Sequence, residues 1–206
     1  PAVLFDADGT LLDSTPMVER AARRWAVEYG LDADAYLAVS HGRRTSDSVA
    51  EFLPPGKVRE ATDRLDELEA ADVDSVMAIP GARELIAGMD GLPWAVVTSM
   101  DPVQLAARSN AAGIPLPEVT VTAFDVERGK PDPSGYLQAA SRLGFDPHAC
   151  VVIEDSPAGV SAGRAAGCTV IAVTTSHEKA DLTEADLIVP DLRSVTATAE
   201  SLQIRV

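Results

Sequence analysis

Two aspartates, one residue apart, end the first apolar run of this chain. The stretch reads LFDADGTLLDS over residues 4–14, with Asp6 directly after the apolar residues and Asp8 two positions later. Two carboxylates this close repel one another, and a strand interior disfavours aspartate. An aspartate at a strand end can attack phosphorus and form an aspartyl-phosphate. A second aspartate beside it can protonate the leaving oxygen and then activate water.

The glycine that follows, Gly9, permits the chain to turn sharply after the two acids. A calcium-binding loop does not fit this stretch. Counted from Asp6, the glycine stands at the fourth position rather than the sixth, and Met17 occupies the twelfth position, where such loops carry glutamate. A purely structural aspartate turn is the remaining alternative.

Two further polar motifs offer groups that bind phosphate. Thr98 and Ser99 follow an apolar run and supply a hydroxyl and a backbone N–H that can hold a phosphate oxygen. Lys130 stands between a glycine and a proline, and an ammonium fixed there can neutralise a nucleophilic carboxylate and a phosphate together. Taken singly, a plain strand end and an exposed turn would explain these residues.

The last motif, at Glu154 and Asp155, places two adjacent acids at the end of an apolar run. Buried and unpaired they would be costly, but Mg²⁺ binds carboxylate oxygens together with water and substrate phosphate. A helix cap is the structural alternative. The four motifs together are far more specific than any one of them. Mg²⁺ and Lys130 would supply the positive charge that lets Asp6 and Asp8 lie together.

The elements that must position these motifs are short apolar runs alternating with helical patterns. Helical patterns over Ser134–Leu143 and Ala158–Ala166 each end before a glycine, the usual helix stop. This alternation predicts an α/β fold with a doubly wound, Rossmann-like parallel sheet, whose ligand site lies at the carboxyl ends of the strands. The expected strands are Ala2–Phe5, Trp94–Val97, Val119–Thr122, Cys150–Ile153, Thr169–Val173 and Leu187–Val189.

Residues 16–78 break the alternation, because they show no clear strand and carry helical patterns only. We interpret this segment, called the helical insert below, as a small α-helical unit inserted after the first strand. The chain is therefore expected to divide into an α/β core of residues 1–15 and 79–206 and a helical cap domain of residues 16–78.

The composition narrows the classes of partner. The 206 residues carry a formal net charge of −15, which argues against nucleic acid or an anionic membrane, since both need basic patches. A small anionic substrate stays compatible, because a few local cations or a metal can hold it. Cys150 and Cys168 lack CxxC spacing and predict reduced core residues of a cytoplasmic protein. We expect a monomer.

In this order the motifs resemble those of the haloacid dehalogenase-like hydrolases. DADGTLLDS, VVTSM, GKPDP and VIEDSPAGVSAG occur in the order of that family, over nearly the whole chain. The helical insert is similar to the cap of the β-phosphoglucomutase-like branch. Within this branch the pattern is most similar to small sugar- and polyol-phosphate phosphatases, of the 2-deoxyglucose-6-phosphate and glycerol-phosphate types. The resemblance implies hydrolysis of a small phosphorylated metabolite, with Mg²⁺ as cofactor.

The resemblance also implies a role for each matching residue. Asp6 would be the nucleophile and Asp8 the general acid and base. Mg²⁺ would be bound by Asp6, the Asp8 carbonyl and Asp155, with Glu154 as a ligand or as a support behind the ligands. The catalytic set would be Asp6, Asp8, Thr98 and Lys130, and the phosphate-binding set Ala7, Gly9, Thr98, Ser99 and Lys130.

The segment Ser40–Ser48 of the helical insert is expected to contact the substrate. Arg44 matches an arginine of the phosphatase pattern, whereas Arg43 replaces a more usual aromatic residue. With His41, these arginines would reach the substrate when the cap closes. An exposed basic turn on an acidic protein is the alternative.

Other functions stay open. Mutases of this branch carry a histidine near position 18, where this chain reads PMVE over residues 16–19, and this favours hydrolysis. A catalytically silent phosphate-binding protein would share the fold. A serine-hydrolase elbow, GVSAG around Ser161, is disfavoured because no acid lies between this serine and the last histidine, His177. A phosphonate-cleaving enzyme would need a Schiff-base lysine, and the insert offers Lys57 in charged surroundings.

Overall fold

A six-stranded parallel sheet forms the centre of the molecule. The computed structural model describes residues 1–198 and 201–205. The strands are β1 (Ala2–Phe5), β4 (Trp94–Val97), β5 (Val119–Val121), β6 (Cys150–Glu154), β7 (Thr169–Val173) and β8 (Leu187–Val189). Their order is β5-β4-β1-β6-β7-β8, and every neighbouring pair is parallel. The prediction of a doubly wound α/β fold is confirmed, and the expected strands differ from the observed ones by one residue at the ends of β5 and β6.

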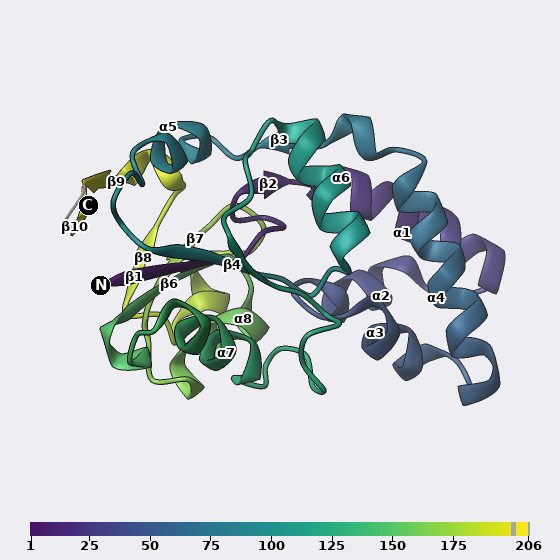
Figure 1. Ribbon diagram of the computed structural model, residues 1–206. Helices are drawn as coiled ribbons and strands as arrows, with labels where there is room; N and C mark the ends of the chain where they lie inside the picture. Colours follow the sequence, from purple (N-terminus) through teal and green to yellow (C-terminus); the bar gives the residue numbers. More distant parts are fainter. Residues whose placement is uncertain (199–200, 206) are drawn as a thin grey trace.

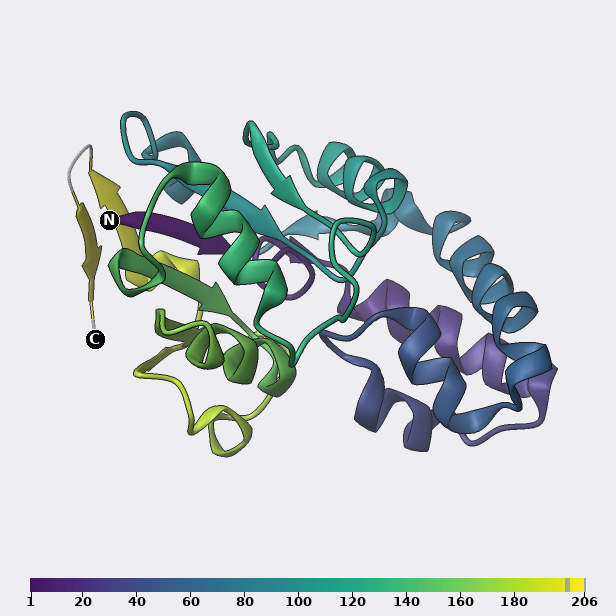
Figure 2. The same ribbon diagram turned by 60° about the horizontal axis from the view of Figure 1, so that its bottom comes forward.

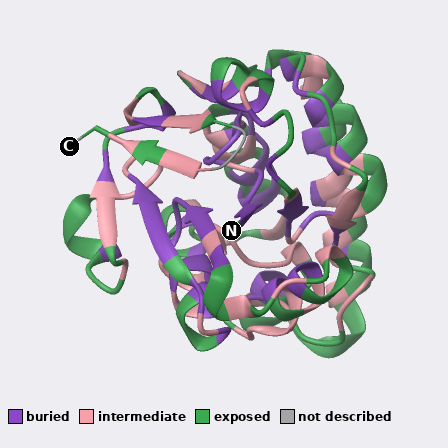
Figure 3. Cartoon of the chain, turned by 60° about the vertical axis from the view of Figure 1, so that its left-hand side comes forward, coloured by how far each residue is buried: buried purple, intermediate pink, exposed green. Residues whose placement is uncertain are grey.

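Helices cover both faces of this sheet. α7 (Ser134–Leu143) and α8 (Pro157–Ala165) pack on one face, and α5 (Ala82–Ala87) and α6 (Pro102–Ala112) pack on the other (Figure 1). A parallel strand covered on both faces is apolar along its length, and all four residues of β1 are buried. Figure 3 shows buried residues gathered in the central strands and exposed residues on the outer helices.

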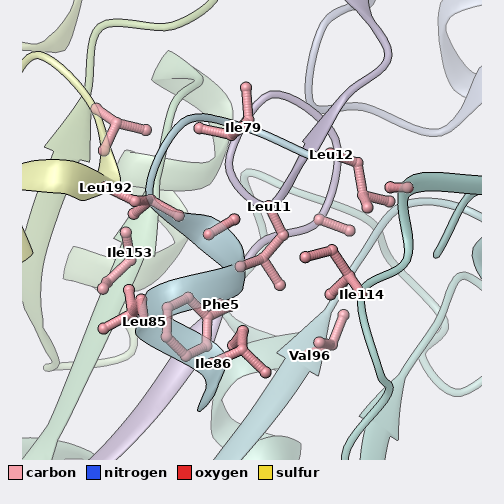
Figure 4. Close-up of a cluster of buried hydrophobic side chains, with 14 of the residues drawn as sticks. Phe5, Leu11, Leu12, Ile79, Leu85, Ile86, Val96, Ile114, Ile153 and Leu192 are labelled. Carbon is pink, nitrogen blue, oxygen red and sulfur yellow. The ribbon is translucent and has the colours of Figure 1, made fainter. Parts of the chain in front are cut away.

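One apolar core lies between β1 and α5. Phe5 meets Leu85, Ile86 and Ile153 there (Figure 4). The Phe5 ring also packs edge to face on Trp94, with 5.8 Å between the ring centroids. Burying a side chain of this size stabilises the fold by about 1.5–3 kcal/mol. These contacts fix the strand whose next residue is Asp6.

The helical insert has a separate apolar core. Trp25 lies at its centre, with its ring 4.9 Å from that of Tyr36 and its Nε1 donating to the carbonyl of Ala61 at 2.9 Å. The insert lies beyond the carboxyl ends of the central strands in both ribbon views (Figures 1 and 2). Its helices are α1 (Thr15–Tyr29), α2 (Ala33–Ser40), α3 (Thr45–Phe52) and α4 (Pro55–Ala70).

The expectation that residues 16–78 hold no strand is wrong at their C-terminal end. β3 (Met77–Ala78) pairs antiparallel with β2 (Leu12–Asp13). A ladder of two residues is too short to leave a period-two pattern in the sequence. The pairing joins the two places where the chain passes between the sheet and the helical insert.

The remaining elements are short. Among the described residues, no helix combines the length and the apolar character needed to cross a membrane. The short elements are the 3₁₀ turns η1 (Val73–Ser75), η2 (Pro147–Ala149), η3 (Lys179–Leu182) and η4 (Leu192–Ser194), and the hairpin strands β9 (Val195–Thr198) and β10 (Ser201–Ile204).

Candidate active site

The topology brings the sequence motifs to one edge of the sheet. β1 lies between β4 and β6, so Asp6 after β1 is flanked by Thr98 after β4 and by Glu154 and Asp155 at the end of β6. All four side chains are buried. The carboxyl ends of the strands in a doubly wound sheet form its ligand crevice. The motif residues therefore converge where such a fold binds ligands.

Lys130 is held between the acids by three hydrogen bonds. Its Nζ donates to Asp6 Oδ1, to Glu154 Oε1 at 2.7 Å and to the Val97 carbonyl at 3.2 Å. An ammonium has three protons, and all of them are used here. The Nζ also lies 5.2 Å from the centroid of the Tyr136 ring. Lys130 is thus a positive charge fixed in position beside Asp6.

Glu154 has donors on both of its carboxylate oxygens. Oε1 accepts from Lys130 and from the Tyr136 hydroxyl at 2.9 Å. Oε2 accepts from the backbone N–H groups of Asp155 at 2.8 Å and Ser156 at 3.0 Å, and from the Ser156 hydroxyl. This carboxylate orients Lys130 and the loop after β6, which leaves Asp6 and Asp155 as the less saturated acids.

Three buried carboxylates share the one ammonium of Lys130. Burial raises the pKa of Asp6 well above its ordinary value, against the attraction of Lys130. Burial and the charge of Glu154 raise the pKa of Asp155 to about 7. Burial opposes ionisation of Glu154 too, but Lys130 and the backbone N–H groups outweigh it and lower the pKa. A second cation beside Asp6 and Asp155 would therefore favour the ionised form of both carboxyls.

These acids fit a divalent metal ion. One carboxylate oxygen from each of Asp6, Glu154 and Asp155 lies within 4.8 Å of the others. Gly9 has a φ of +79°, and a Cβ built on it would lie 2.1 Å from Asp155 Oδ2, so a larger residue would fill the space beside this oxygen. Carboxylate and carbonyl oxygens are the donors that Mg²⁺ prefers. The residues present therefore suit Mg²⁺.

Asp8 lies on the side of the site that faces the helical insert. Both of its carboxylate oxygens accept from Nη1 of Arg108, each at 2.9 Å. Nη2 of the same guanidinium donates to Glu69 Oε2, on α4, at 2.5 Å. The sequence motifs did not reveal Arg108 or Glu69. The sequence held one signal for Arg108. This residue stands at helical spacing from Leu105 and Ala112, and therefore on the buried face of α6.

A cavity of about 80 Å³ lies between these acids and the helical insert. His41 and Arg43 line it from the insert. Arg44 does not: its guanidinium donates to the carbonyls of Val126 at 2.6 Å and Glu127 at 3.0 Å. The structure therefore brings two of the three expected substrate-contacting residues to the cavity. Arg44 instead holds the insert to the loop that precedes Lys130.

The expected phosphate-binding residues have different environments. Thr98 and Ser99 line the cavity, and the Ser99 hydroxyl donates to the Gly42 carbonyl at 2.8 Å, which joins the core to the helical insert. Ala7 is buried, and its carbonyl accepts from the backbone N–H groups of Leu11 and Leu12, both at 2.9 Å. Ala7 therefore holds the loop after β1 in its turned shape.

Hydroxyl donors around Asp155 are a second group that the motifs did not reveal. The Thr10 hydroxyl donates to Asp155 Oδ1 at 3.0 Å, and the Ser176 hydroxyl donates to Oδ2. Thr10 belongs to the DADGT stretch and could have been found from the sequence, whereas Ser176 lies in a loop without a motif.

Two histidines meet between the core and the helical insert. His177, next to Ser176, packs edge to face on His41, with 5.5 Å between the ring centroids. Burial and the neighbouring His177 lower the pKa of His41.

The structure argues against the serine-hydrolase and the phosphonate-cleaving alternatives. Ser161 lies inside α8, and its hydroxyl donates to Glu184 at the surface, so it is not a serine on a strand-to-helix elbow. The glycines around it serve packing: a Cβ at Gly159 would lie 1.6 Å from the Glu154 carboxylate. Lys57 is exposed, pairs with Glu60 and lies outside the cavity, so it is not placed to form a Schiff base there.

A contact between the helical insert and α6 predicts a pH effect on stability. Gln104 Nε2 donates to Asp66 Oδ1 at 3.0 Å, and burial raises the pKa of Asp66 to about 6. Between about pH 4 and pH 6 the native state keeps a proton that the unfolded chain has lost, so the free energy of unfolding falls as pH rises through this window. Asp66→Asn keeps the acceptor and removes the charge. We expect it to stabilise the protein by about 1 kcal/mol at pH 8, because solvent screens a half-buried group.

Urea unfolding of wild type and Asp66→Asn at pH 4 and at pH 8 measures this effect. The two proteins should differ most at pH 8 and much less at pH 4, where the native carboxyl is protonated and the carboxyl of the unfolded chain is only about half ionised. The same difference at both pH values would contradict the assignment to Asp66 ionisation.

The chain is similar to known phosphatases in sequence and to a phosphate-bound protein in structure. A sequence model of the haloacid dehalogenase-like hydrolases matches residues 1–167. Hexitol phosphatase A from Escherichia coli K12 is 44% identical over 203 residues, which cover 96% of this chain and 94% of that protein. Glycerol-1-phosphate phosphohydrolase 2 from Saccharomyces cerevisiae is 36% identical over 208 residues, covering 94% of this chain and 83% of that protein. The crystal structure of CbbY from Rhodobacter sphaeroides in complex with phosphate has a TM-score of 0.81 at 26% identity, over 93% of this chain and 94% of that one. The resemblance predicted from the four motifs is confirmed.

Proposed function

Because the chain belongs to the haloacid dehalogenase-like hydrolases, we propose that it hydrolyses phosphate monoesters of small sugars or polyols. The observation that carries the proposal is Asp6, buried beside the fixed ammonium of Lys130 and facing a cavity that Asp8 also lines. The relatives named for hexitol and glycerol phosphate support a polyol phosphate as the substrate class.

In the first half of the proposed reaction, an Asp6 carboxylate oxygen attacks phosphorus. A bond forms between Asp6 and phosphorus, and the bond from phosphorus to the ester oxygen breaks. Asp8, carrying a proton, delivers it to that oxygen, and the alcohol leaves. Lys130 opposes the negative charge that gathers on the phosphoryl oxygens, with Thr98 and the Ser99 N–H as further donors. The product on the protein is an aspartyl-phosphate at Asp6.

In the second half, Asp8 is ionised and takes a proton from water. The water oxygen attacks phosphorus, the acyl-phosphate bond to Asp6 breaks, and inorganic phosphate is released. Asp8 thereby regains the proton that it gave away in the first half. Asp6, Asp155 and the Asp8 carbonyl would hold Mg²⁺, with Glu154 orienting Lys130 behind them. When bound, the ion supplies positive charge opposite the phosphoryl oxygens.

The helical insert, residues 16–78, would act as a cap domain over this chemistry. The Ser99 contact to Gly42 and the Arg44 contacts to Val126 and Glu127 support this role, because they join the insert to the loops around the cavity. Closure of such a cap excludes bulk water from the reacting groups, and opening releases product. His41 and Arg43 would contact the part of the substrate beyond the phosphate.

Phosphate release from a panel of esters tests the proposal. We expect release from hexitol, hexose or glycerol phosphates with Mg²⁺ present, and a fall of at least about 100-fold when EDTA replaces the metal, because charge opposite the transferred group is lost. A colorimetric phosphate assay on the purified chain measures both. An isomerised sugar phosphate without free phosphate would indicate a mutase, and binding without turnover would indicate a silent phosphate-binding protein.

A further inference from the structure

We propose that Arg108 is a positioning residue that lets the helical insert hold Asp8 in place for proton transfer. The inference rests on the proposed function, since it takes Asp8 as the proton donor. Arg108 lies outside the four sequence motifs, and its partner on the helical insert is Glu69 of α4.

The geometry is a bridge of one guanidinium between two carboxylates. Nη1 of Arg108 lies 2.9 Å from both oxygens of Asp8, and Nη2 lies 2.5 Å from Glu69 Oε2. The side chains of Arg108 and Glu69 are 5% and 7% exposed, whereas that of Asp8 is 30% exposed and faces the cavity. The planar fork of arginine fixes the two carboxylates relative to one another. Asp8 is therefore oriented by a group that is itself anchored.

The two ends of the bridge belong to different parts of the molecule. Asp8 follows β1 in the core, and Glu69 lies in the last turn of α4 in the helical insert. A second contact between the same two helices, Gln104 to Asp66, lies one turn away on each. If the insert moves off the core, Arg108 loses Glu69, and the restraint on Asp8 weakens. Seating of the insert and orientation of Asp8 are thus coupled through one side chain.

Stability alone does not account for this bridge. Buried ion pairs are weak stabilisers, because removing charges from water costs about as much as their attraction returns. Arg108 sits on the buried face of α6, beside Leu105 and Ala112, where an aliphatic residue would pack without that cost. What the bridge provides instead is a fixed position for a cavity-lining carboxylate that exchanges a proton.

The leaving group distinguishes positioning of a proton donor from a general loss of structure. The alkoxide of sorbitol 6-phosphate needs a proton in order to depart, whereas the phenolate of p-nitrophenyl phosphate leaves without one. In Arg108→Met we expect kcat/KM for sorbitol 6-phosphate to fall about 100-fold and that for p-nitrophenyl phosphate less than about 10-fold, since only the first ester depends on a well-placed acid. The fall on sorbitol 6-phosphate should lie in kcat rather than in KM.

Arg83→Met is the matched control. Arg83 donates from Nε and Nη2 to the Ala112 carbonyl at the end of the same helix, α6, without touching Asp8. Its loss should lower activity on the two esters equally, if at all. The double variant Arg108→Met with Glu69→Gln removes the buried charge that the single variant would strand at Glu69, so it keeps the test valid if the single variant unfolds.

The outcomes separate the two claims. A larger loss on sorbitol 6-phosphate than on p-nitrophenyl phosphate, in the single or the double variant, supports positioning of Asp8 by Arg108. Equal losses on both esters, or unchanged kcat/KM, overturn it while the phosphatase stands. Wild-type protein that releases phosphate from neither ester would sink the proposed function itself.

Discussion

Asp6→Asn is expected to lower phosphate release by about four orders of magnitude or more, because the amide cannot form the phospho-enzyme bond. The substitution is nearly isosteric, and an amide oxygen can still accept from Lys130. Burial raises the pKa of Asp6 in the metal-free protein, so a neutral side chain should fit the fold at least as well. Activity should vanish while the free energy of unfolding stays the same or rises.

Phosphate release and urea unfolding on the same preparation measure this result. Asp63→Asn is the matched control: it makes the same substitution at an exposed aspartate of α4, outside the cavity, and should leave both quantities unchanged. Turnover of Asp6→Asn at a wild-type rate would reject Asp6 as the nucleophile.

Lys130→Met is expected to damage both stability and activity. It removes the ammonium that Asp6 and Glu154 share and leaves two buried carboxylates without their positive counter-charge. Breaking a buried pair from one side typically lowers the free energy of unfolding by about 3–5 kcal/mol. Phosphate release should fall about 1,000-fold, because a fixed charge opposite the phosphoryl oxygens is lost. Urea unfolding in EDTA, followed by the phosphate assay with Mg²⁺, measures the two effects.

A double-mutant cycle identifies the origin of the lost stability. Glu154→Gln removes one of the two stranded charges and keeps one acceptor oxygen, for either Tyr136 or the backbone N–H groups of Asp155 and Ser156. If unpaired charge is the cause, Lys130→Met combined with Glu154→Gln should be more stable than Lys130→Met alone. Additive losses in the cycle would mean that Lys130 and Glu154 act independently.

The sheet and its ligand edge could be predicted from the sequence because both depend on local patterns. A buried parallel strand reads as a short apolar run, and the polar residue that ends it is visible as a break, as at Asp6 and Asp155. Topology then follows from the alternation of strands and helices. The strand order alone therefore predicts that motifs far apart in the sequence meet at one edge of the sheet, without knowledge of how their side chains pack.

The side of the site formed by the helical insert could not be predicted in the same way. Arg44 and Arg43 are neighbours in the sequence, yet one binds loop carbonyls and the other lines the cavity. Which arginine reaches the cavity depends on how α3 is seated on the core, and no local pattern encodes that. Arg108 and Glu69 escaped notice for the same reason, since each is an ordinary charged residue of a helix until the two helices meet.

The short ladder between β2 and β3 has a consequence for how proteins of this architecture can diversify. It pairs Leu12 with Ala78 and Asp13 with Met77, so the chain departs from the sheet and rejoins it at adjacent positions. Insertions are tolerated where their ends lie close together, since the host fold need not deform to accept them. The segment between these ends can therefore be lengthened, shortened or exchanged for one from a relative as a self-contained cassette. Under the proposed function, such an exchange would replace the insert residues that face the alcohol, His41 and Arg43 among them. It would keep Asp8 anchored only if the new segment also supplied a carboxylate to Arg108 in the place of Glu69.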